Sequence, residues 1–129
     1  MNRLVLIGCA VLACATACGG GGATLYTAAA TKACLQKQSV RVRPAPASDF
    51  VANSATGGAF SVTTRGNRVT VSFGETVADA DNIDQAYRRF RAKNVGINDV
   101  LRTQGNAVML WHLHPLDTDI STITSCLKG

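Results

Sequence analysis

The pattern of apolar and polar residues marks five strand-like segments. They are residues 39–43, 59–64, 68–73, 100–103 and 107–113. The second and third flank Arg65-Gly66-Asn67, where Gly and Asn can take positive φ, and therefore predict a β-hairpin. The last segment, AVMLWHL, is apolar on both faces up to His112, which is typical of a central strand covered on both sides.

Apolar residues at helical spacing predict three helices, over residues 25–37, 78–93 and 117–127. Thr24 and Asp117 are the expected N-caps of the first and third helices. The middle helix is acidic near its start and basic near its end, as the helix dipole favours. The predicted buried stripes are Ile83, Ala86, Tyr87 and Phe90 in the middle helix, and Leu116, Ile120, Ile123 and Leu127 in or beside the last.

These elements predict a single α+β domain over residues 24–129. Their order is α-β-ββ-α-(β)-β-α, with helices packed against a small, mostly antiparallel sheet. Residues 45–58 are predicted to be a loop, with the pair Phe50-Val51 tucked under the fold. The pattern leaves the order of the strands open.

Residues 1–17 have a different pattern, which is typical of an export signal. Arg3 is followed by an uncharged stretch of apolar or small residues from Leu4 to Ala17. This stretch is too short for a comfortable membrane span, which takes about 20 apolar residues. Residues 18–23 then read as a flexible tether, because Cys18 is followed by four glycines.

The end of this leader resembles the lipobox of bacterial lipoproteins, in which an apolar or small residue and two small residues precede a cysteine. Residues 15–18 and 11–14 both match in outline, ending in Cys18 and Cys14. Cys18 is preferred because the glycines follow it directly and cleavage there leaves an even number of other cysteines. The resemblance implies acyl chains on Cys18 that anchor the protein to the extracytoplasmic face of a membrane. A plain secreted protein and a short apolar N-terminal anchor are the alternatives.

Cys34 and Cys126 are the two cysteines that remain after Cys18. An even count in an oxidising compartment predicts a structural disulfide that closes the domain. Two reduced, buried cysteines are the alternative. A redox pair is disfavoured because nothing here has the C-x-x-C spacing.

The segment Trp111-His112-Leu113-His114-Pro115 carries the candidate metal chemistry. In a strand, His112 and His114 share a face about 7 Å apart and could chelate Zn²⁺ or Cu²⁺, with Asp117 or Asp119 as a third ligand. The alternative is a partly buried His112 at the strand end and a His114 that caps the exit. Trp111 is expected in the core rather than on a binding surface. No cofactor is predicted.

Thirteen Lys and Arg against eight Asp and Glu give a net charge of +5. This charge suits an anionic lipid or cell-wall environment, but it is too dispersed to predict nucleic-acid binding. The basic end of the middle helix either contacts anionic headgroups or polymer, or is a solvated face. Its residues are Arg88, Arg89, Arg91 and Lys93.

The sequence contains no catalytic signature. G-x-S-x-G is absent, Glu75 is the only Glu, and the glycines at 19–22 follow no strand. The leading hypothesis is therefore a lipid-anchored, non-enzymatic envelope protein that binds an envelope protein or a cell-wall ligand. The alternatives are a metal-binding protein that uses His112 and His114, and an inhibitor of a secreted or cell-wall enzyme that presents residues 45–58.

A looser resemblance concerns the C-terminal half. The segments NVGINDVL, AVMLWHLHP and SCLK are similar to those of small uncharacterised bacterial envelope lipoproteins, which have a cysteine in a short final helix, as Cys126 is expected to be here. The resemblance supports the architecture and implies no activity.

Overall fold

Five strands form one antiparallel sheet in the order β1-β2-β3-β5-β4. They are β1 (Arg41–Pro44), β2 (Ala59–Thr63), β3 (Arg68–Phe73), β4 (Leu101–Gln104) and β5 (Ala107–Trp111). This computed structural model describes residues 24–91 and 96–129. The predicted leader, Cys18 and the glycine tether lie outside the described residues. The α+β class is confirmed, and the described sheet is antiparallel throughout.

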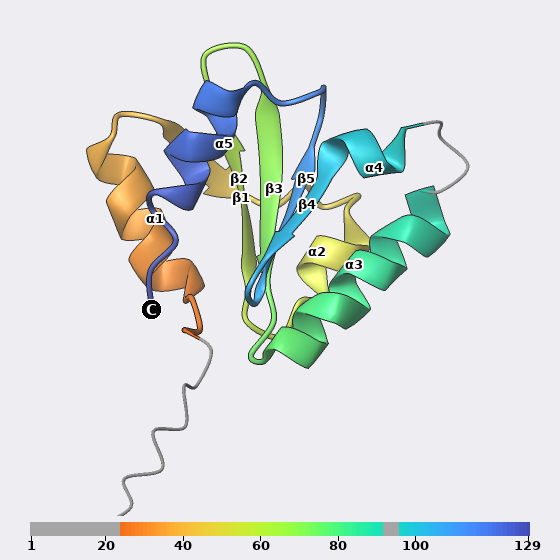
Figure 1. The fold of residues 1–129 in the computed structure, drawn as a ribbon. Helices are drawn as coiled ribbons and strands as arrows, with labels where there is room; N and C mark the ends of the chain where they lie inside the picture. The colour runs from red at the N-terminus through yellow and green to blue at the C-terminus, as the bar shows by residue number, and fades with distance from the viewer. Residues whose placement is uncertain (1–23, 92–95) are drawn as a thin grey trace, which may run out of the picture.

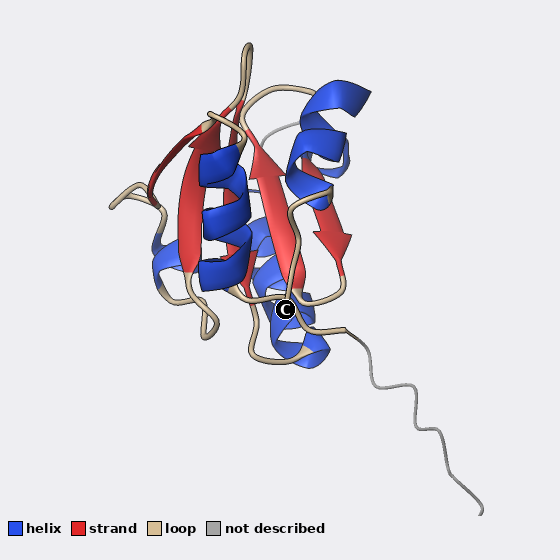
Figure 2. Cartoon of the chain, turned by 90° about the vertical axis from the view of Figure 1, so that its left-hand side faces the viewer, coloured by secondary structure: helices blue, strands red, loops and turns tan. Residues whose placement is uncertain are grey.

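Helices cover both faces of the sheet (Figure 1). On one face lie α1 (Ala28–Lys37) and α5 (Asp117–Thr124), and on the other α2 (Phe50–Asn53), α3 (Val77–Arg91) and α4 (Ile97–Val100). Figure 2 looks from the α1 and α5 side and shows both helices lying in front of the sheet. The four-residue helices α2 and α4 were not predicted, because a single turn is too short to show a helical period. Within the described ranges, none of the helices combines the length and the apolar character needed to cross a membrane.

Alternation along the central strands divides the core into two clusters. One cluster faces α1 and α5 and includes, from the central strands, Val69, Val71, Phe73, Ala107, Met109 and Trp111. The other cluster faces α3, where Val108 and Leu110 pack with Ala80, Ile83 and Tyr87. Every residue of β5 is buried, so the predicted central strand and the core position of Trp111 are confirmed.

A disulfide between Cys34 and Cys126 confirms the predicted bridge. It joins α1 to the segment after α5 across a sequence separation of 92, with the two Cα atoms 5.4 Å apart. Beside it the amide of Thr27 donates to the carbonyl of Lys128 (2.7 Å). The two ends of the described domain are therefore fixed to each other.

Two predicted helix ends and one predicted N-cap were wrong. Tyr26 donates its amide to the Asn106 side chain (2.7 Å), so α1 begins after it, with Thr27 rather than Thr24 as the N-cap. The last helix, α5, ends at Thr124, whereas the sequence predicted that it would end at residue 127. Its first turn is stabilised by Asp119, not Asp117: the Asp119 carboxylate accepts from the amide of Leu116.

Phe50 and Phe90 were both predicted to be buried, and both are 57 % exposed. The turn of α2 directs Val51 into the core and Phe50 outward. The two rings meet edge to face with their centroids 4.9 Å apart. Each ring thus covers part of the other at the surface. The 65–67 turn also differs from expectation, because neither Gly66 nor Asn67 has positive φ.

Candidate binding site

A pocket of 140 Å³ opens on the α3 side of the sheet, beside the segment that leads into α2. Strand alternation places Arg68 and Thr70 of β3 on this face, and Leu110 of β5 lies next to them. The remaining lining residues are Pro46, Ser48, Asp49, Trp111 and His112. The pocket therefore joins the predicted 45–58 loop to the predicted histidine segment.

Asp49 forms one wall of the pocket and is only 5 % exposed. It is the N-cap of α2, where its Oδ1 accepts from the amide of Ala52 (3.1 Å). The hydroxyl of Tyr87, from α3, donates to the same carboxylate (3.2 Å to Oδ2). No Lys, Arg or His of the described residues forms an ion pair with it. Its negative charge is thus held in place by hydrogen bonds without a cation.

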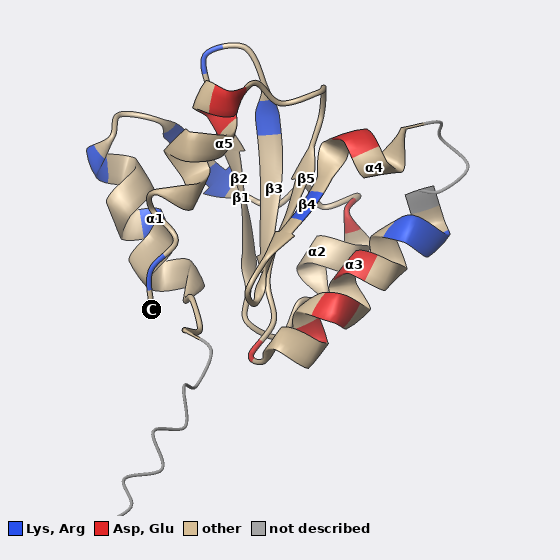
Figure 3. Ribbon diagram, viewed as in Figure 1, with Lys and Arg blue, Asp and Glu red and all other residues tan. Residues whose placement is uncertain are grey.

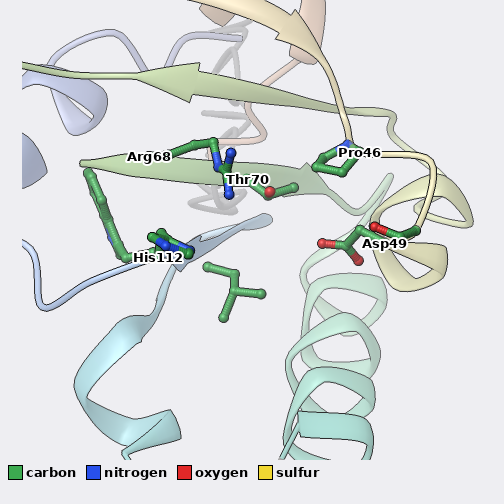
Figure 4. A pocket seen from close by; sticks show the side chains of 8 residues that line it. Pro46, Asp49, Arg68, Thr70 and His112 are labelled. Carbon is green, nitrogen blue, oxygen red and sulfur yellow. The ribbon is translucent and has the colours of Figure 1, made fainter. Parts of the chain in front are cut away.

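The opposite wall carries hydrogen-bond donors and positive charge. Figure 4 shows Arg68, Thr70 and His112 across the pocket from the Asp49 carboxylate. Arg68 and His112 are held side by side because the amide of His112 donates to the carbonyl of Arg68 (2.8 Å). The Arg68 side chain has no ion pair within the described part of the chain. The pocket therefore has the Asp49 carboxylate on one side and the Arg68 guanidinium on the other, and neither group has an ion-pair partner among the described residues.

The predicted strand over 107–113 ends early, at Trp111. The cause is Asn67, whose side chain takes both backbone groups of Leu113: its Nδ2 donates to the carbonyl (3.0 Å) and its Oδ1 accepts from the amide (3.1 Å). The backbone turns away from the ladder there, so the premise that put His112 and His114 on one strand face was wrong. Both side chains are exposed, so the prediction of a partly buried His112 was also wrong.

The two histidines have different surroundings. His112 lines the pocket with Arg68, whereas His114 Nδ1 lies 2.5 Å from a carboxylate oxygen of Asp99, which precedes β4. Sequence reasoning considered Asp117 and Asp119 instead. Asp117 is exposed in the first turn of α5, and Asp119 bonds to Leu116. Across residues 24–91 and 96–129, no group of three His, Cys, Asp or Glu could hold a metal ion, and metal binding by the histidine pair stays a prediction.

Arginines gather at one end of the sheet on the face that carries the pocket. Register places Arg41 opposite Thr63 and Thr63 opposite Arg68, so the three side chains form one row across β1, β2 and β3. Arg43 lies two residues along β1 on the same face, and Arg65 lies in the β2–β3 turn. We call Arg41, Arg43, Arg65 and Arg68 the arginine end (Figure 3). All four are exposed, and none forms an ion pair in the described residues.

The basic end of α3 is arranged differently. Arg88 Nε lies 2.5 Å from Oδ1 of Asp84, and its Nη1 donates to Asn98. Arg89 is exposed. Lys93 and the side chain of Arg91 lie outside the described residues. The prediction of a solvated helix face or an anionic contact at this end stays a prediction.

Sequence reasoning missed Asp49, Arg68 and the row that Arg68 forms with Arg41. The signal was present in the polar positions of β1, β2 and β3, which alternate with buried or partly buried apolar residues. It could not be used without the strand order, which brings Arg41 and Arg68 to one face. Comparison of the chain with protein families, curated proteins and solved structures gives no match.

Proposed function

We propose that this protein is a lipid-anchored, non-enzymatic binding domain on the extracytoplasmic face of a membrane, and that it holds an anionic polymer of the envelope. The observation that carries the proposal is the arginine end. Four exposed guanidinium groups without a carboxylate partner attract extended anions, because each can bind an acidic group bidentately. Pairing within the protein would have cancelled much of this attraction.

The leader and the disulfide support the location. The pattern of residues 1–17, followed by Cys18 and four glycines, is that of an exported lipoprotein. Disulfides such as Cys34–Cys126 persist in oxidising compartments and are rare where thiols are kept reduced. Lipidation at Cys18 with export is the simplest account of both features together.

The position of the arginine end supports a partner away from the anchoring membrane. The described chain begins near the C-terminus, at the end of the sheet opposite to the β2–β3 turn (Figure 1). Five residues, 19–23, separate Cys18 from Thr24, and the six Cα–Cα steps between the two span at most about 20 Å when extended. The arginine end is therefore remote from the tether, where a polymer of the surrounding envelope can reach it.

The test is a titration of the full chain, in detergent, with fluorescently labelled poly-L-glutamate, followed by anisotropy. We expect saturable binding that weakens as salt is added, because exposed charges are screened. The double variant Arg41→Glu/Arg43→Glu should lower the affinity about tenfold or more, since repulsion replaces two attractive contacts.

The matched control is Lys32→Glu/Lys128→Glu. It changes the net charge by the same amount on side chains that are also exposed but lie outside the arginine end. We expect its affinity to stay within about twofold of the unmodified chain. Equal losses in the two double variants, or no binding by the unmodified chain, would contradict the proposed polymer site.

A further inference from the structure

We propose that the pocket between Asp49 and Arg68 binds a small zwitterion, a free amino acid with a short side chain. Arg68 belongs both to the pocket and to the arginine end, but this inference does not rest on the proposed function, because it is carried by the position of Arg68 opposite Asp49 across the pocket. It starts from the buried carboxylate of Asp49, which points into the pocket in Figure 4. The opposite wall holds Arg68 and His112.

The charges of the two walls select the ligand. A buried carboxylate without a cation is costly, and a ligand ammonium group would supply the missing charge. The Asp49 oxygens accept from Ala52 and Tyr87, which leaves acceptor capacity for further donors. A ligand carboxylate would meet Arg68 across the pocket. A simple anion would be repelled by Asp49 and a simple cation by Arg68, whereas a zwitterion satisfies both.

The size and polarity of the walls fit a ligand of a few heavy atoms. The volume of 140 Å³ is well below the roughly 300–1,000 Å³ of drug-sized pockets. Thr70 is 7 % exposed, and its hydroxyl forms no hydrogen bond with the described residues, so it can bond to the bound molecule. Leu110 and Pro46 supply apolar contact for a short aliphatic part.

Arg68 is not itself the counter-charge of Asp49 in this structure. The two side chains line the same pocket, yet no nitrogen of Arg68 lies within 4.0 Å of a carboxylate oxygen in the described residues. A bound zwitterion would bridge the two groups.

The experiment is an NMR titration of the ¹⁵N-labelled full chain, in detergent, with glycine, alanine and β-alanine as probes. We expect saturable shifts centred on residues 46–49, 68–70 and 110–112. Acetate and methylammonium, which each carry half of the charge pattern, should bind at least about tenfold more weakly. Shifts that do not saturate, or half-ligands that bind as well as glycine, would overturn the proposal.

Three variants connect the binding to the residues. Asp49→Asn keeps an oxygen for the Ala52 amide, and Arg68→Gln changes an exposed side chain, so both should fold. We expect each to weaken binding of the preferred probe about tenfold or more. Arg65→Gln is the matched control, because Arg65 is exposed and does not line this pocket. Equal effects of Arg65→Gln and Arg68→Gln would overturn the assignment. The assignment would also be overturned if no probe bound while the effects of Asp49→Asn and Arg68→Gln on the free energy of unfolding were non-additive. Arg68 would then be the partner of Asp49.

Discussion

Two buried asparagines, which directly precede β3 and β5, fix the ends of the central strands by bonding to backbone that is distant in sequence. Asn67 takes both backbone groups of Leu113 and thereby ends β5. Asn106 donates to the carbonyls of Tyr26 (2.9 Å) and Gly74 (2.7 Å) and accepts from the amide of Tyr26. The sequence marked Asn67 as a turn residue, but the tertiary partners of the two asparagines lie 32 to 80 positions away and no local pattern reveals them.

Replacing Asn106 with Ala should lower the free energy of unfolding by about 3 kcal/mol. The change removes three hydrogen bonds from a side chain that is 1 % exposed, and it leaves backbone groups of Tyr26 and Gly74 without a partner. Urea denaturation monitored by circular dichroism measures it. Asn82→Ala is the control, because Asn82 is exposed on α3 and should change stability by less than about 0.5 kcal/mol. A similar loss in both variants would contradict the role given to Asn106.

At the scale of elements, the connection from β3 to α3 depends on a close approach of backbone segments. Thr76 and Asp79 begin α3 with reciprocal bonds between side chain and amide (3.1 and 3.0 Å). Gly74 lies directly before this turn, and a Cβ atom there would come within 2.5 Å of the Thr76 carbonyl oxygen and 2.6 Å of the Ala80 nitrogen. The approach therefore requires glycine for steric reasons.

Gly74→Ala should destabilise the protein by about 1–3 kcal/mol, because the surrounding backbone must shift to accept a methyl group. Gly66→Ala is the matched control. A methyl group on Gly66 would have no atom within 4 Å, and Gly66 has no positive φ, so stability should be unchanged or rise by up to about 1 kcal/mol. Thermal unfolding of the two variants would measure the difference. Equal melting temperatures would contradict the steric account.

Helices and strands with a clear apolar periodicity could be predicted from the sequence. Single-turn helices and features that depend on tertiary packing could not. The hairpin of β2 and β3 and the buried strand β5 follow from their apolar patterns, as does α3. The four-residue helices, the exposure of Phe90 and the pocket depend on how the elements pack. Asp49 shows the limit for the candidate site. Its sequence context indicates a loop residue, and only the fold sets it opposite Arg68.

At the scale of the whole molecule, the disulfide joins the first helix to the segment that follows the last one. Reduction, or the double variant Cys34→Ala/Cys126→Ala, should lower the free energy of unfolding by up to about 4–5 kcal/mol in the chain-entropy treatment, because the closed loop spans most of the domain. Chemical denaturation with and without dithiothreitol measures the loss. The double variant should not respond to the reductant. An unchanged stability on reduction would mean that the bridge does not constrain the unfolded chain.

We propose that the domain is held at a membrane by a lipid on Cys18, with its arginine end directed away from that membrane. Mass spectrometry of the full chain expressed in bacteria tests it most directly. We expect an N-terminal peptide that begins at Cys18 and carries acyl chains, with Cys18→Ser abolishing the modification and Cys14→Ser leaving it intact. An unmodified N-terminus, or acylation at Cys14, would contradict anchoring through Cys18.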